Sequence, residues 1–138
     1  MREALSNAGK TPGEVDYVNL HGTGTLLNDS MEALAMAAVF PVSPPVSSTK
    51  PITGHTLGAA GALELALCWM ALYAAAHTTE GTGRAPVHRW DGVPDEALPA
   101  LHFVGTENGA QKLRICMSNS FAFGGCNTSL IIGGLAFE

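Results

Sequence analysis

The feature that most constrains the fold is the alternation of short apolar segments, rich in β-branched residues, with longer helical patterns. The predicted strands are 15–20, 46–49 and 101–104, together with a hairpin of 112–118 and 128–132. The predicted helices are 2–8, a second from Asn28 or Asp29 to about Phe40, and 57–76. This order predicts an α/β fold with layers around a mixed sheet. The stretch 77–99 lacks a sustained hydrophobic periodicity and is expected to be a surface loop.

Two histidines at the heads of glycine-rich stretches are the candidate functional residues. His21 opens the run His-Gly-Thr-Gly-Thr, and His55 follows Lys50 within the segment 47–61. Glycines beside a polar side chain let backbone amides approach a ligand closely. We expect both histidines at the carboxyl ends of strands, where open α/β sheets bind ligands, with the segment 119–127 as a further wall of the site.

Two neutral imidazoles can donate hydrogen bonds to one carbonyl oxygen, which stabilises an enolate or a tetrahedral oxyanion. Lys50 adds a positive charge nearby, and Glu64 is the carboxylate expected to neutralise it. A lysine–glutamate pair beside two histidines would help to hold the imidazoles neutral or set their tautomers.

The composition predicts one domain whose surface is partly covered by a partner. Only 14% of the 138 residues are charged, where about a quarter is typical of soluble domains. This deficit indicates a face covered by another domain or subunit. The net charge of −5, without any run of Lys or Arg, argues against a nucleic-acid partner.

The remaining sequence signals favour structural roles. Cys68, Cys116 and Cys126 lack paired spacing, which is typical of reduced thiols and predicts a cytoplasmic protein. The run 57–76 is long enough to span a bilayer, but Glu64 within it favours a helix buried in an α/β protein, so no membrane span is expected. No spacing of histidines suggests a metal site.

The motifs resemble those of the β-ketoacyl-acyl-carrier-protein synthases, most closely the elongating type. His21 and its glycines, with Asp29 and Glu32 in the first turn of the next helix, are similar to the family's first histidine motif. Residues 50–61 are similar to its lysine/histidine motif, and 119–127 to its C-terminal gating loop. The resemblance extends over nearly the whole chain.

The resemblance implies the C-terminal half of a thiolase-like fold, with three α/β/α layers and a mixed five-stranded sheet formed by one domain, residues 1–138. It implies a decarboxylative Claisen condensation, in which malonyl-carrier protein loses CO2 and the enolate attacks an acyl group held on a cysteine. The partners implied are acyl carrier protein, whose phosphopantetheine carries the substrates, and an N-terminal half in cis or on another chain, within a homo- or heterodimer. No other cofactor is implied.

The same resemblance implies the site roles. His21 and His55 are expected to bind the malonyl thioester oxygen, and Lys50, paired with Glu64, to organise the second histidine. The supporting residues are Thr23 and Thr25 along the pantetheine tunnel, Phe123 as the gate over the nucleophile, Gly124 and Gly125 allowing its loop to swing, and Asn119 supporting that loop.

Two departures from the family pattern leave alternatives open. The family nucleophile belongs to the N-terminal half, and none of the three cysteines here lies in the expected turn. Ala122 stands where the family usually has glycine; a positive φ there would cost about 1 kcal/mol and stiffen the gate. The alternatives are a non-catalytic partner akin to chain-length factors, an inactive fragment, and a thiolase-type enzyme that does not decarboxylate its donor.

Overall fold

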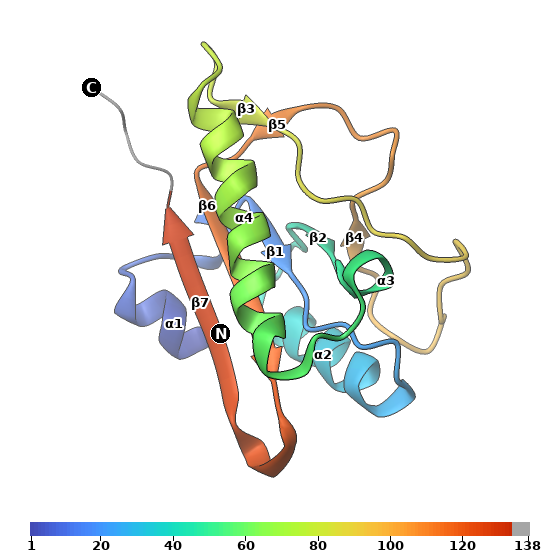
Figure 1. Ribbon diagram of the computed structural model, residues 1–138. Coiled ribbons are helices and arrows are strands. Elements are labelled where there is room, and N and C mark those ends of the chain that lie inside the picture. The colour runs from blue at the N-terminus through green and yellow to red at the C-terminus, as the bar shows by residue number, and fades with distance from the viewer. Residues whose placement is uncertain (134–138) are drawn as a thin grey trace.

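A mixed five-stranded sheet forms the centre of the computed structural model, which describes residues 1–133 apart from the side chain of Phe123 (Figure 1). The strand order is β4-β2-β1-β6-β7. Their bounds are Tyr17–Asn19 (β1), Pro45–Ser47 (β2), His102–Phe103 (β4), Ile115–Phe121 (β6) and Asn127–Gly133 (β7). Strands β4, β2, β1 and β6 are parallel, and β7 pairs antiparallel with β6. The predicted mixed sheet and C-terminal hairpin are confirmed.

The helices match the predicted order with two differences. Their bounds are Arg2–Asn7 (α1), Leu26–Val39 (α2), Lys50–Thr53 (α3) and Ala60–Ala76 (α4), with short 3-10 turns at Pro12–Glu14, Leu57–Ala59 and Phe123–Gly125. Helix α2 begins before Asn28, because Thr25 takes the extended backbone of an N-cap. Helix α3 was not predicted. Neither was the small antiparallel sheet of β3 (Thr82–Gly83) and β5 (Gln111–Lys112), whose strands are too short to show a period.

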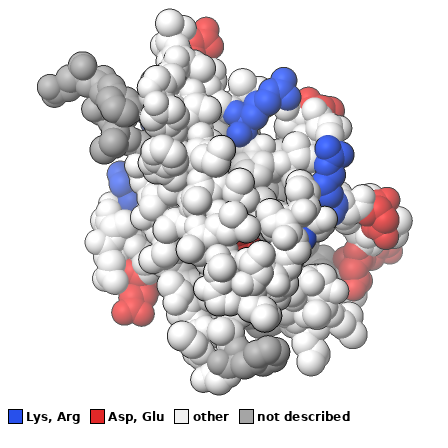
Figure 2. Space-filling view, in the orientation of Figure 1, with Lys and Arg blue, Asp and Glu red and all other residues white. Residues whose placement is uncertain are grey.

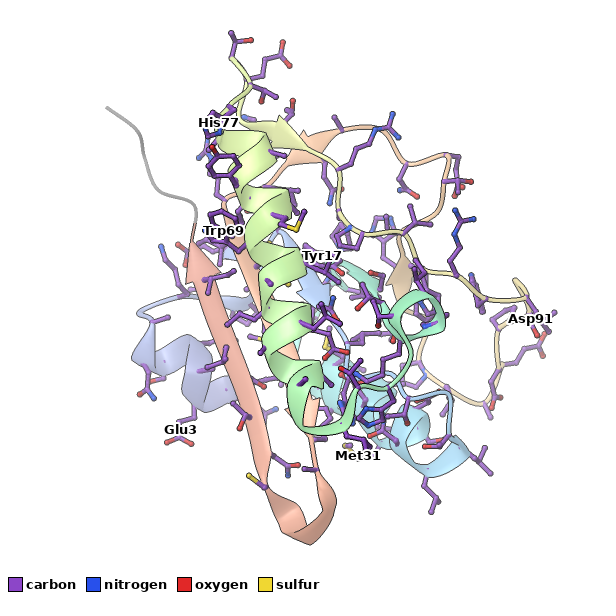
Figure 3. The ribbon with its side chains drawn as sticks, in the orientation of Figure 1. Glu3, Tyr17, Met31, Trp69, His77 and Asp91 are labelled. Carbon is purple, nitrogen blue, oxygen red and sulfur yellow. The ribbon has the colours of Figure 1, made fainter. Side chains whose placement is uncertain are left out.

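Two apolar clusters, one on each face of the sheet, produce the three α/β/α layers. Successive strand residues point to opposite faces. Tyr17 and Cys116 therefore join the cluster beneath α4, whereas Val18 and Met117 join the cluster beneath α1 and α2. Figure 3 shows Tyr17 between α4 and the strands. The layers hold the carboxyl ends of β1, β2 and β6 at one edge of the sheet.

Helix α4 lies across β1, β6 and β7 (Figure 1). By length and composition alone, Leu57–Ala76 could cross a membrane, with a mean hydropathy of 1.5. Its inward stripe is composed mainly of small residues, which allow close packing on the sheet: Ala60, Glu64, Cys68, Ala71, Leu72 and Ala75. Its other face exposes Trp69, Met70 and Tyr73. Lys, Arg, Asp and Glu lie mainly at the margins of this view (Figure 2).

Candidate active site

Buried polar side chains gather where β1, β2 and β6 end. Polar groups are rarely buried unless they are hydrogen-bonded or functional. The buried polar residues at these strand ends are Asn19, His21, Ser47, Ser48, Thr49, Lys50, Ser118 and Asn119. Since the carboxyl ends of parallel strands form the usual ligand edge of an open α/β sheet, this edge is the candidate site.

His21 and His55 lie side by side at this edge. Their ring centroids are 5.6 Å apart and the ring planes are nearly perpendicular, at 86°. His21 is buried and follows β1, separated only by Leu20, as predicted. His55 does not end a strand, because β2 ends at Ser47 and the turn of α3 intervenes. That part of the expectation is wrong, although the two rings meet as the chemistry requires.

The hydrogen bonds at Nδ1 assign the tautomer of both rings. Lys50 Nζ lies 3.4 Å from His21 Nδ1, and an ammonium group can only donate. The Leu57 N–H donates to His55 Nδ1 at 3.2 Å. A neutral imidazole whose Nδ1 accepts carries its proton on Nε2. Each histidine therefore has an Nε2–H available as a donor, and two such donors can share one substrate oxygen.

The surroundings of His21 favour its neutral form. Burial, then the Lys50 ammonium and His55, together lower the pKa of His21 from 6.5 to about 4, against the opposing charge of Asp29. Desolvation and a nearby like charge both disfavour the imidazolium ion. His21 is therefore uncharged at neutral pH and can donate through Nε2 without carrying a formal charge.

Lys50 and Glu64 form the predicted ion pair, and both side chains are buried. Lys50 also donates to the carbonyl oxygen of His21. The expectation that Lys50 organises the second histidine is therefore corrected: its contacts are with His21. Burial raises the pKa of Glu64, and the ammonium group of Lys50 opposes that rise. The pair holds the Lys50 ammonium group at the Nδ1 side of the His21 ring.

Sequence reasoning placed Glu32 in the first histidine motif but missed its contacts in the site. This residue was expected to place charge in the first turn of a helix, but α2 begins at Leu26, so Glu32 lies in the second turn and is buried. Its carboxylate accepts the His21 N–H at 2.9 Å and the Gly22 N–H at 2.8 Å. Asn119 Nδ2 donates to it at 3.1 Å. The available signal was that Glu32 follows Asp29, a possible helix cap, by three residues. This spacing does not reveal the hydrogen-bond partners of Glu32, which are distant in sequence.

Asn119 connects the C-terminal hairpin to this network. Besides its bond to Glu32, it accepts a hydrogen bond from Ser129 Oγ at 2.8 Å. Phe121 packs its ring edgewise on His21, with 5.9 Å between centroids. The third sequence motif therefore reaches the histidine pair. The expected gate, the Phe123 side chain, lies outside the described part of the structure.

The backbone of the hairpin turn removes the concern about Ala122. This residue is extended, with φ of −120° and ψ of 163°, a conformation that any residue adopts. The left-handed conformations fall on Gly124 and Gly125 instead, at φ of 77° and 78°. Alanine at position 122 is therefore unstrained, and the predicted cost does not arise.

The two threonines of the first motif lie between His21 and the start of α2. Thr23 Oγ1 and Thr25 Oγ1 share a hydrogen bond of 2.9 Å, and Thr25 is exposed at the start of α2. Their expected contact with pantetheine stays a prediction. Among residues 1–133, no group of three His, Cys, Asp or Glu side chains is arranged to hold a metal ion.

Comparison with known families decides the relationship. The model described as β-ketoacyl synthase, C-terminal domain, matches residues 1–79, which include both histidines, Lys50 and Glu64. The chain belongs to this family.

Curated relatives extend the match over the rest of the β-ketoacyl synthase domain. The chain is 40% identical to 3-oxoacyl-acyl-carrier-protein synthase 2 of Coxiella burnetii, over 96% of this chain and 30% of the relative. It is also 40% identical to nodulation protein E of Rhizobium meliloti, over 94% of this chain and 31% of the relative. The chain spans about a third of the length of these relatives.

Solved structures share the thiolase-like fold of this β-ketoacyl synthase domain. The complex of a ketosynthase with its chain length factor from Xenorhabdus doucetiae contains a chain that matches with a TM-score of 0.82 and 46% identity, over 98% of this chain and 32% of that one. A β-ketoacyl synthase from Burkholderia phymatum matches with a TM-score of 0.79 and 36% identity, over 98% and 31%. The predicted fold class is confirmed.

The cysteines of this synthase domain lie away from the histidine pair or at the surface. Cys68 and Cys116 are buried beneath α4, as predicted for core residues. Contact with Cys68 and then burial raise the pKa of Cys116 well above its usual range, so its thiol stays protonated. Cys126 is exposed after the turn at Phe123–Gly125.

Proposed function

We propose that this chain supplies the two-histidine half of the active site of an elongating β-ketoacyl-carrier-protein synthase. The observation that carries the proposal is the pair of Nε2–H donors on His21 and His55, whose rings are 5.6 Å apart. The similarity to 3-oxoacyl-acyl-carrier-protein synthases supports the same reaction class.

In the proposed reaction, a malonyl thioester on acyl carrier protein binds with its thioester oxygen between the two Nε2–H groups. The bond from the α-carbon to the carboxylate breaks, CO2 leaves, and the electron pair forms an enolate whose oxygen accepts both hydrogen bonds. Preorganised hydrogen-bond donors stabilise such developing charge. The Lys50 ammonium beside His21 adds a positive potential, and the low pKa of His21 keeps that ring neutral.

The enolate carbon then attacks an acyl thioester on a cysteine. A carbon–carbon bond forms, the cysteine thiolate leaves, and the β-ketoacyl product remains on carrier protein. We assign this cysteine to the part of the synthase that lies outside the third of the fold represented here, as the one-third coverage of the relatives supports. The only prosthetic group required is then the phosphopantetheine arm of the carrier protein.

The experiment is to assay malonyl decarboxylation and condensation by the full-length synthase that contains this chain, with the remaining two thirds taken from a relative if needed. His21→Ala and His55→Ala are each expected to lower kcat by about 10²–10³, the usual cost of removing one oxyanion donor. The control is His102→Ala, because His102 is exposed on β4. Unchanged decarboxylation in both active-site variants would overturn the assignment.

A second candidate is a ketosynthase-like partner subunit akin to chain length factors. Its support is the structural similarity to a complex that contains a chain length factor. The complete set of His21, His55 and the Lys50–Glu64 pair favours the catalytic role, because a subunit that only shapes an acyl tunnel does not need two convergent donors. Acyl transfer by the assembled protein, lost in His55→Ala, separates the two candidates.

A further inference from the structure

Residues 84–101, here called the strap, arch away from the sheet beside α2 and α3 (Figure 1), with Asp91 at the outer turn (Figure 3). Near the start of the strap, the His88 N–H donates to the Val104 carbonyl at 2.8 Å. The His88 ring stacks on the Phe103 ring, with centroids 4.3 Å apart and planes at 15°. The centroid of the Trp90 ring lies 5.6 Å from that of His88. These contacts fix the imidazole next to the end of β2, since β4 pairs with β2.

His88 Nδ1 accepts the Ser48 N–H at 3.1 Å. Ser48 is buried and follows the last residue of β2, so its N–H has left the sheet ladder and needs another acceptor. The bond pins the backbone at the residue where β2 becomes the segment that carries Lys50. Burial lowers the pKa of His88, which leaves Nδ1 unprotonated and able to accept.

Ser48 in turn holds both catalytic segments. Its hydroxyl donates to the Gly22 carbonyl at 2.6 Å and accepts the Lys50 N–H at 3.3 Å. Gly22 follows His21 directly, so the Ser48 hydroxyl sets the distance between the segment of the first histidine and that of the lysine. A series of three hydrogen bonds therefore runs from the strap to the two segments that surround the His21 ring.

We propose that His88 is a positioning residue for the histidine pair, acting through the Ser48 N–H. The proposal rests on the proposed function and assigns the strap a part in it: the strap supplies the acceptor that holds Ser48, and through Ser48 the Gly22 and Lys50 backbones, in the catalytic arrangement. A displacement of about 1 Å at a catalytic group can lower the rate on the order of a hundredfold. A side chain that reaches the catalytic segments through two successive hydrogen bonds can therefore still affect the rate.

The test compares two substitutions in the full-length synthase. His88→Phe keeps a ring for Phe103 to stack on but removes the acceptor. His88→Asn removes the ring but places an amide oxygen where Nδ1 stood. The matched control is His102→Phe, at the exposed histidine next to Phe103. The measurements are kcat and KM for condensation, and hydrogen exchange of the peptide that contains the Ser48 amide.

We expect His88→Phe to lower kcat about tenfold with KM for malonyl-carrier protein nearly unchanged, and to accelerate exchange at Ser48. In His88→Asn, kcat and the exchange rate at Ser48 should be close to those of the parent. His102→Phe should change neither quantity. Unchanged kcat in His88→Phe would overturn the proposal, as would equal losses in the Phe and Asn variants, which would indicate ring packing alone.

The failure of the proposed function has a different signature. In that case His21→Ala and His55→Ala would leave condensation unchanged, whereas exchange at Ser48 would still respond to His88→Phe and recover in His88→Asn. If exchange at Ser48 is the same in the parent protein, His88→Phe and His88→Asn, the strap is not linked to the catalytic segments, whatever the activity.

Discussion

At the scale of single residues, the protonation of His21 is the property on which the proposed chemistry depends. A protonated ring would repel the Lys50 ammonium, which lies 3.4 Å from Nδ1. Burial and the neighbouring charges lower the pKa of His21 to about 4, so the neutral ring is the stable form in the folded protein. The same shift couples the stability of the fold to pH.

The sign of this coupling gives a first prediction. Between pH 6.5 and about 4, His21 binds a proton in the unfolded chain but not in the folded one, so the free energy of unfolding falls as the pH decreases through this range. His21→Asn lacks this contribution, and its stability should fall less steeply over the same range. Urea denaturation at several pH values measures both slopes. Parallel curves for the two proteins would contradict the prediction.

Gly22 packs tightly against Ser48 in the site. It adopts φ of +37°, and a Cβ added there would lie 2.6 Å from Ser48 Cβ. We expect Gly22→Ala to destabilise the protein by about 2–4 kcal/mol, from the left-handed backbone plus the clash, and to lower kcat by displacing Ser48.

Gly24→Ala is the matched control for that substitution. Gly24 also has a positive φ, of +73°, but no atom lies within 4 Å of an added Cβ. Its cost should be the backbone cost alone, about 1–2 kcal/mol. Thermal unfolding and condensation assays of both variants measure the difference, and equal losses would show that contact with Ser48 does not matter.

At the scale of elements, two buried carboxylates join segments that the backbone alone would leave separate. Glu32 connects α2 to the His21–Gly22 segment and, through Asn119, to β6. Glu64 connects α4 to α3 through Lys50. Burying a carboxylate is costly unless it is paired or hydrogen-bonded, so each of these residues makes the position of one element depend on another.

The Lys50–Glu64 pair allows this dependence to be measured. Lys50→Met should lower the free energy of unfolding by about 3–5 kcal/mol, because it leaves Glu64 buried without a counter-charge. Lys50→Met combined with Glu64→Leu should recover most of that stability while activity stays low. Chemical denaturation of the single and double variants tests this prediction. Strictly additive losses would show that the two side chains are not energetically coupled.

At the scale of the whole molecule, the apolar surface is extensive for a domain with so few charges. Trp69 is 53% exposed on α4, and Leu26 and Leu27 are 78% and 84% exposed at the start of α2. Trp69, which projects from α4 (Figure 3), stacks on Tyr73 with ring centroids 5.1 Å apart. Large exposed apolar patches usually mark an interface.

This surface predicts how the chain behaves by itself. The isolated chain should bind a hydrophobic dye strongly and associate as its concentration rises, and both effects should decrease when it is joined to the remaining two thirds of the synthase. Dye fluorescence and light scattering of the two proteins make the comparison. Weak dye binding by the isolated chain would show that the exposed side chains do not form a continuous apolar surface.

The order of elements and the residues that gather at the candidate site were predictable because both depend on local patterns. The β-branched segments, the apolar helix at 57–76 and the hairpin were located within a few residues, and His21, His55, Lys50 and Glu64 were identified from their spacing and motifs. The elements that were not predicted are short. Helix α3 has one turn and β3 has two residues, too few for a periodicity to develop.

By itself, therefore, the sequence determined which residues are candidates for the chemistry and which segments form strands and helices. The tertiary structure decided which partner each polar group has. Glu32 meets Asn119 across 87 residues and Ser48 meets His88 across 40, and neither pairing leaves a periodic trace in the chain. The physical reason is that amphipathic periodicity records burial, whereas a buried hydrogen bond depends on where two separate segments come together once the layers have packed.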